Sequence, residues 1–133
     1  LFDPKESIDF NGHTGPFIQY THARIKSVLR RAAIDFNGDN ASVQLNSNEK
    51  EIVKFIYDFE GVLEEAGKNF SPALIANYVY ELTKSYNRFY HDYSILKEEN
   101  ESVKKFRLQL SQTVGLVISN AMKLLGITVP ERM

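Results

Sequence analysis

Residues 49–66 read EKEIVKFIYDFEGVLEEA, and their apolar side chains recur at steps of three and four positions. That spacing places them on one stripe of an α-helix, because 3.6 residues make one turn. The stripe consists of Ile52, Phe55, Ile56, Phe59, Val62, Leu63 and Ala66. Asn48, followed by Glu51, is typical of an N-terminal capping pair, and Gly67 is typical of the residue that follows a helix. The segment therefore predicts an amphipathic helix.

The same periodicity predicts three further helices. The first runs from near Pro16 to about Ala33, and its apolar face consists of Ile18, Ile25, Val28, Leu29 and Ala32. Ser71 and Pro72 are suited to the N-cap and the first turn of another helix. Its stripe consists of Ile75, Tyr78, Leu82, Tyr86, Phe89 and Tyr93. The last stripe, which Gly126 ends, consists of Val103, Phe106, Leu110, Val114, Val117, Ala121 and Leu124.

Length and composition fit one globular domain. The chain has 133 residues, of which 43% are hydrophobic and 25% charged, so a disordered or collagen-like protein is excluded. The absence of cysteine excludes a disulfide scaffold, a thiolate metal site and a cysteine nucleophile. No strand of convincing length appears, and residues 1–15 are rich in Asp, Pro, Gly and Asn. The expected fold is an all-α helical bundle with an irregular N-terminal segment.

Charge is distributed unevenly, although the net charge is only −1. The predicted first helix has no acid and carries four basic residues, Arg24, Lys26, Arg30 and Arg31. The predicted second helix has six acids and two lysines. The last helix again has no acid and carries Lys104, Lys105, Arg107 and Lys123. Basic helices are typical of proteins that bind a phosphate backbone, but they are equally consistent with ion pairs to the acidic helix within the bundle.

No catalytic constellation is found in the sequence. Asp9, His13 and His22 are close in sequence, but their spacing matches neither a metal site nor a catalytic triad. No glycine-rich phosphate loop is present. His22, beside Arg24, is expected to form a hydrogen bond or to face RNA. Tyr90 falls at the margin of the apolar stripe, where a ring either covers the core edge or stacks on an unpaired base.

Two motifs, one at each end of the chain, resemble those of arginyl-tRNA synthetases. They are IDFNGHTGPFIQYTHARI at residues 8–25 and LLGITVPERM at residues 124–133. The segments YVYEL at 78–82 and NRFY at 87–90 match the helical middle of the same region. The resemblance covers essentially the whole chain, and it points to the DALR-type anticodon-binding domain at the C-terminus of these class I synthetases.

This resemblance implies a DALR-type helical domain at residues 16–133, preceded by a linker from a catalytic domain at residues 1–15. A first residue other than Met agrees with a piece of a longer protein. The implied function is binding of the anticodon stem and loop. The implied partners are arginine tRNA and the rest of the synthetase chain, in the cytoplasm and without a membrane. The parent enzyme attaches arginine to its tRNA with ATP.

The HIGH and KMSKS signatures of the catalytic domain are absent from the chain. No catalytic residue and no metal ligand is therefore expected here, and ATP and magnesium belong to the missing domain. On its own, this stretch is expected to be inactive in aminoacylation.

The resemblance also assigns site residues. Tyr20 and Arg24 match a Tyr and an Arg of the first helix that lie against the anticodon loop. Tyr90 matches an aromatic residue that contacts an anticodon base, and Met133 matches a C-terminal Met that packs nearby, with its carboxylate close by. The family often has Tyr where this chain has Phe17, so a hydroxyl contact is lost there.

A second departure is Ser94, because some members have Trp at this position as another stacking platform.

Charge alone, rather than the resemblance, supplies five candidate phosphate contacts, namely Arg30, Arg31, Lys104, Lys105 and Arg107.

An alternative from another class is a helical protein-interaction module whose basic helices dock an acidic partner. The orientation of the tyrosines separates the two hypotheses. Exposed rings of Tyr20 and Tyr90 beside a basic helix face favour RNA, whereas buried rings and basic helices on different faces favour a protein partner.

Overall fold

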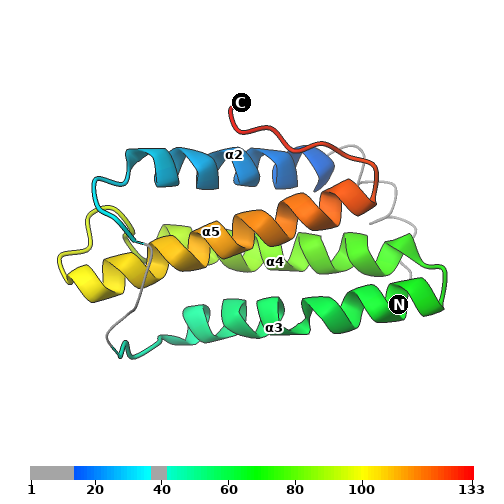
Figure 1. The fold of residues 1–133 in the computed structure, drawn as a ribbon, viewed down its shortest axis with the longest axis horizontal. Helices are drawn as coiled ribbons and strands as arrows, with labels where there is room; N and C mark the ends of the chain where they lie inside the picture. The colour runs from blue at the N-terminus through cyan, green and yellow to red at the C-terminus, as the bar shows by residue number, and fades with distance from the viewer. Residues whose placement is uncertain (1–13, 37–41) are drawn as a thin grey trace.

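A computed structural model describes residues 14–36 and 42–133 of the chain. These residues form four α-helices and no strand, as Figure 1 shows. The helices are α2 (Gly15–Arg31), α3 (Ser47–Lys68), α4 (Pro72–Asp92) and α5 (Glu101–Leu124). The prediction of an all-α bundle is confirmed. Residues 1–13, which include most of the predicted linker, lie outside the described residues.

Helix α3 begins two residues before the predicted segment. The Oδ1 atom of Asn46 accepts a 2.8 Å hydrogen bond from the backbone N–H of Glu49. In return, a Glu49 carboxylate oxygen accepts one of 2.9 Å from the backbone N–H of Asn46. The capping pair is therefore Asn46 with Glu49, and the predicted pair of Asn48 with Glu51 is wrong. The sequence NSNEKE contains this pattern twice, and spacing alone does not distinguish the two copies.

The end of α3 also differs from the prediction. The helix continues through Lys68, and Phe70 rather than Gly67 adopts the left-handed conformation after it, with a φ of 49°. Ser71 N–H donates to the Ala66 carbonyl at 3.0 Å, which closes a Schellman turn. The Phe70 side chain is 93% exposed, so packing does not compensate for the unfavourable backbone conformation. The end of α5 has the same turn with a glycine, Gly126, at the left-handed position.

Replacing Phe70 by glycine should stabilise the domain. Glycine adopts a positive φ without a Cβ clash, so we expect Phe70→Gly to raise the free energy of unfolding by about 0.5–1 kcal/mol. Urea unfolding followed by circular dichroism measures the change. Phe70→Ala, which removes the exposed ring but keeps the Cβ, is the matched control and should leave stability nearly unchanged. An equal gain from both variants would contradict the backbone explanation.

Helix α5 occupies the centre of the bundle, with α2 and α3 on opposite sides of it in Figure 1. It packs against each of the other three helices, whereas α2 and α3 make no substantial contact with each other. A Cβ on Gly115 would lie 3.2 Å from the Cγ2 atom of Ile25, so this glycine permits the close approach of α5 to α2. The largest fully buried side chains include Ile18, Ile52, Leu82, Tyr86, Phe89, Leu108, Ile118 and Met122.

The core includes one polar contact between α4 and α5. The hydroxyl of Tyr86 donates to the Oγ atom of Ser111 at 2.9 Å. The Ser111 hydroxyl in turn donates to the Arg107 carbonyl at 2.8 Å. Burial raises the pKa of Tyr86 well above its ordinary value, so the phenol stays neutral and remains a donor. The tyrosine thereby fixes the register of α4 against α5.

Candidate functional site

Three of the predicted site residues meet between α2 and α4. The guanidinium carbon of Arg24 lies 4.5 Å from the centroid of the Tyr90 ring and 5.2 Å from that of Tyr20. Both distances lie within the range of cation–π attraction. Tyr20 is 51% exposed and Tyr90 is half-buried, so both rings reach the surface. Tyr20 and Arg24 are four residues apart and share one helix face, while Tyr90 comes from the last turns of α4.

Asn87 fixes the position of Arg24. Its Oδ1 atom accepts a hydrogen bond of 2.6 Å from the Arg24 Nη1 atom. The Asn87 amide nitrogen donates to the Thr21 hydroxyl and to the Thr83 carbonyl, each at 2.9 Å. These bonds determine which way the amide points, because its nitrogen can only donate and its oxygen can only accept. Sequence reasoning missed this role for Asn87, although the residue lies within the NRFY segment.

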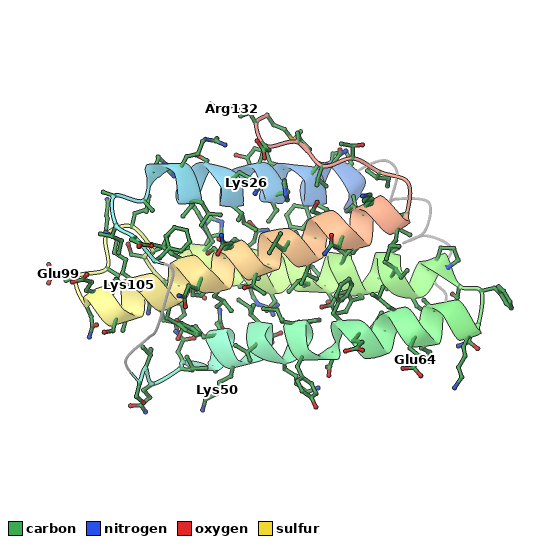
Figure 2. All side chains as sticks on the ribbon, viewed as in Figure 1. Lys26, Lys50, Glu64, Glu99, Lys105 and Arg132 are labelled. Carbon is green, nitrogen blue, oxygen red and sulfur yellow. The ribbon has the colours of Figure 1, made fainter. Side chains whose placement is uncertain are left out.

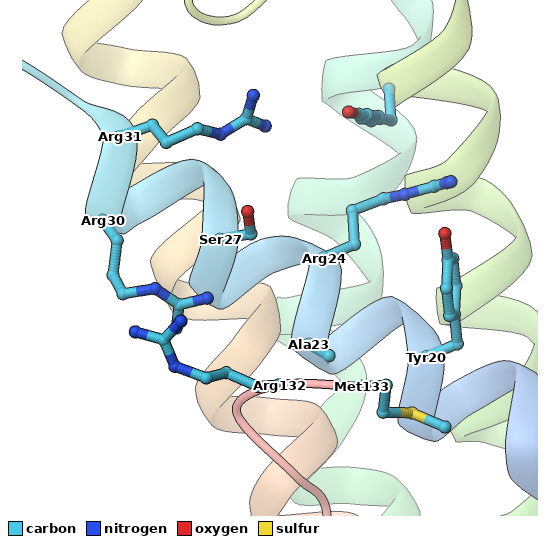
Figure 3. Close-up of a pocket in the computed structure, with 9 residues that line it drawn as sticks. Tyr20, Ala23, Arg24, Ser27, Arg30, Arg31, Arg132 and Met133 are labelled. Carbon is cyan, nitrogen blue, oxygen red and sulfur yellow. The ribbon is translucent and has the colours of Figure 1, made fainter.

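A cavity of about 360 Å³ opens beside this cluster and contains the predicted residues Tyr20, Arg24, Tyr90 and Met133 in its wall. The other lining residues are Ala23, Ser27, Arg30, Arg31 and Arg132. In the described part of the chain, four arginines and no acidic side chain line it. Figure 3 shows the Arg30 and Arg132 side chains extending toward one another at its edge. Such a wall attracts anions, and guanidinium groups suit phosphate oxygens.

The chain after α5 brings Arg132 and Met133 to the cavity. This tail runs back along α2 and ends beside it (Figure 1). The Met133 side chain is 70% exposed and lies near the α2 turn that carries Tyr20 in Figure 3. Arg132 was missed as a site residue by the sequence reasoning, although it stands directly beside Met133 in the C-terminal motif.

The basic residues of α5 occupy other places. Lys104 and Lys105 lie on the first turns of the helix and are not part of this cavity wall. Lys105 forms an ion pair of 3.5 Å with Glu101. In Figure 2 it lies at the end of the bundle, well away from Arg132. The role of Lys104 and Lys105 as phosphate contacts remains a prediction.

Arg107 is buried, and its place corrects the expectation of a phosphate contact. Its Nε atom donates to a Glu49 carboxylate oxygen at 3.0 Å, and its Nη1 atom donates to the Ser94 carbonyl at 2.7 Å. The partner Glu49 is itself buried. Since the guanidinium is held inside the protein by α3 and the α4–α5 connection, Arg107 belongs to the core rather than to the phosphate contacts.

The placement of the basic helices separates the two readings of the charge pattern. Ion pairs join α3 to α4 through Glu51 and Arg88, and to α5 through Glu49 and Arg107. Among the residues that the structure describes, none joins α3 to α2. The ion-pair interpretation thus holds for part of α5, whereas the arginines of α2 gather at the cavity.

The two departures from the family pattern, Phe17 and Ser94, are not part of the first cavity's wall. Phe17 packs edge-on against Tyr80, with ring centroids 6.2 Å apart. Ser94 lines a neighbouring hollow of about 410 Å³, which shares Arg31 and Tyr90 with the first cavity. His22 is buried on α2 and forms a hydrogen bond with the Pro130 carbonyl, so it does not face the cavity.

Within residues 14–36 and 42–133, no group of three or more His, Cys, Asp or Glu side chains is arranged to hold a metal ion. None of the helices there combines the length and the hydropathy that a membrane span requires.

Comparison with known proteins identifies relatives along the whole chain. Residues 18–133 match the family model for the DALR anticodon binding domain. The chain is 55% identical over 136 residues to the arginine–tRNA ligase of Phocaeicola vulgatus, covering 99% of this chain and 22% of that protein. It is 54% identical to the arginine–tRNA ligase of Bacteroides thetaiotaomicron, covering 99% of this chain and 23% of the relative. It therefore spans less than a quarter of the length of these relatives.

Solved structures agree with the sequence comparison. The arginyl-tRNA synthetase of Thermus thermophilus superposes with a TM-score of 0.82 at 32% identity, covering 99% of this chain and 23% of that one. The arginyl-tRNA synthetase of Plasmodium falciparum gives a TM-score of 0.79 at 27% identity, with coverage of 99% and 23%. Sequence and structure thus agree on the same region of the same enzymes, and the chain belongs to the DALR anticodon-binding domain family of arginine–tRNA ligases.

Proposed function

We propose that this chain binds the anticodon stem and loop of arginine tRNA. The observation that carries the proposal is the cluster of Tyr20, Arg24 and Tyr90 in the wall of a cavity lined by arginines. Family membership supports the same function. The exposed Tyr20 ring argues against the alternative of a protein-docking module, for which buried tyrosines were expected.

Two kinds of contact would contribute to RNA binding, one to the phosphates and one to the bases. Arg30, Arg31 and Arg132 supply attraction to backbone phosphates. This attraction weakens as salt rises, because the counterions that the protein releases from the RNA then gain less entropy. Tyr20 and Tyr90 offer aromatic surface to bases that leave the loop stack, and each such contact is worth about 1–3 kcal/mol. Met133, a flexible apolar side chain at the same cavity, would cover the edge of an unstacked base.

The activity of the longer protein is part of the same proposal. That protein attaches arginine to its tRNA with ATP in the cytoplasm. The present chain, which spans only part of it, supplies binding rather than chemistry and is inactive alone. Binding energy from this remote contact would help position the distant acceptor end for the transfer.

A titration of the chain with a fluorescent RNA hairpin that carries an arginine anticodon tests the proposal. We expect binding at low salt, weakened as salt rises. Tyr90→Leu should weaken binding about tenfold with an unchanged salt slope, because it removes a stacking surface but no charge. Arg31→Gln should instead lower the magnitude of the slope of log K against log salt by about 0.7, the value for one phosphate contact on a single strand.

Two results would contradict the proposal. One is the absence of binding even at low salt, together with no effect of Tyr90→Leu in the full-length enzyme. The other is equal weakening by Tyr90→Leu and by Tyr57→Leu, a matched control at an exposed tyrosine of α3 that is not in the cavity wall. A hairpin with a different anticodon measures how much of the affinity depends on the bases.

A further inference from the structure

The tail after α5 is held against α2 by side chains. Gly126, in the left-handed conformation, turns the chain back, and Ile127 N–H donates to the Met122 carbonyl at 2.9 Å. In the described residues, this is the last backbone–backbone hydrogen bond of the chain. Ile127 and Val129 pack against the core, but residues 130–133 extend beyond these apolar anchors. Another kind of contact must therefore hold the end of the tail.

Side chains from one helix supply that contact. Gln19 donates to the Thr128 carbonyl at 3.0 Å, and Arg30 donates to the Glu131 carbonyl at 3.2 Å, both at the exposed surface. Between them, the Nδ1 atom of His22 lies 2.7 Å from the Pro130 carbonyl oxygen. Nδ1 must carry the hydrogen, because a carbonyl oxygen only accepts. This bond is the shortest of the three.

His22 differs from the other two because it is 4% exposed. Water cannot readily replace a lost partner at such a place, so the bond matters more than one at the surface. The next residues after Pro130 are Glu131, Arg132 and Met133, and the last two line the cavity. Hence the buried contact lies directly before the part of the tail that the site uses.

We propose that His22 is a positioning residue of the RNA site. It touches no cavity surface itself; by holding the Pro130 carbonyl it places Arg132 and Met133 in the cavity wall. The inference rests on the proposed RNA binding, since it names the residue that completes the same site. A loosely held tail would complete the site in only a fraction of the molecules. The apparent affinity for RNA would be reduced in proportion to that fraction.

Substitutions of His22 test this role in the chain of residues 1–133. Asn places its amide N–H close to the Nδ1 position, whereas Leu fills similar space without a donor. We expect His22→Leu to weaken binding of the arginine-anticodon hairpin about fivefold, and His22→Asn to stay within twofold of the original chain. Deleting residues 131–133 should weaken binding about tenfold, and His22→Leu should then have no further effect. Equal weakening by His22→Leu in both backgrounds would overturn the proposal.

A second readout follows the tail without RNA. The chain has two methionines, so methyl labelling of Met gives two NMR signals. His22→Leu should narrow the Met133 signal and move it toward the position of a free peptide, while the buried Met122 signal stays in place. An unchanged Met133 signal would also overturn the proposal. The Met133 signal is measured without RNA. It therefore reports the position of the tail even if the hairpin fails to bind, so failure of this inference can be told apart from failure of the proposed function.

The Met122 signal also reports on folding. If it moves in the His22→Leu chain, the variant has lost its core, and His22→Gln takes its place. Gln is polar but lacks a donor at the Nδ1 position, so the same results are expected of it, and the same results overturn the proposal.

Discussion

Arg107→Met should lower the free energy of unfolding by about 3–5 kcal/mol, a large part of the stability of a domain of this size. The substitution leaves the Glu49 carboxylate buried without its positive partner, 3.0 Å away in the native protein. It also removes the donor to the Ser94 carbonyl, which ties α5 to the connection that follows α4. Urea unfolding measures the loss. An unchanged slope of the free energy of unfolding against urea concentration would show that the folded state is otherwise intact.

Two further variants isolate the buried pair. Glu49→Gln keeps an acceptor for the capping bond from Asn46 but removes the charge, so the double variant with Arg107→Met should be more stable than Arg107→Met alone. Lys105→Met breaks the exposed pair with Glu101 on the same helix and should cost less than about 0.5 kcal/mol. Similar losses for Lys105→Met and Arg107→Met would refute the importance of burial.

Arg24→Met should weaken binding of the arginine-anticodon hairpin about 30-fold, or roughly 2 kcal/mol, the largest effect expected at the cavity. The guanidinium contacts both tyrosine rings and is held by Asn87, so its loss removes a charge and also frees the two rings. Arg24→Lys should recover little of the affinity, because an ammonium group keeps the charge but not the planar contact with the rings. Fluorescence anisotropy at fixed salt measures each affinity.

Lys26→Met serves as the matched control for Arg24. Lys26 is a basic residue of the same helix (Figure 2), and it is not among the residues of the cavity wall. Its replacement should weaken binding no more than about threefold, the effect of one distant charge. If Lys26→Met and Arg24→Met had equal effects, binding would depend on the overall charge of α2 rather than on the geometry of the cavity.

Periodicity predicted the helices well because it is a local property. The four stripes correspond to four helices whose ends differ from the predictions by a few residues. The last stripe was less complete, since it omitted Leu108, Ile118 and Met122, all fully buried, and included Leu124, which is exposed. A stripe describes one face of a helix, whereas α5 is covered by three neighbours. No pattern within residues 101–124 indicates how many partners will surround them.

The site shows the same limit. Tyr20 and Arg24 lie four residues apart, so their shared face follows from helix geometry. Tyr90 was assigned to the same site only through the family resemblance, because the approach of α4 to α2 is a tertiary contact that spacing along the chain does not show. Arg107 was misplaced for the corresponding reason: Glu49, 58 positions earlier, neutralises it. Counting charges along a segment cannot show which of them the fold brings together.

The central place of α5 bears on how the chain is made. A ribosome synthesises α2, α3 and α4 before α5, and α2 packs mainly against α5 and only slightly against α4. The first three helices therefore cannot complete a common core until residues 101–124 have left the exit tunnel. Until then their apolar stripes stay accessible to chaperones and to other nascent chains. Translation that stops before α5 should yield a product that is degraded rather than a smaller stable domain.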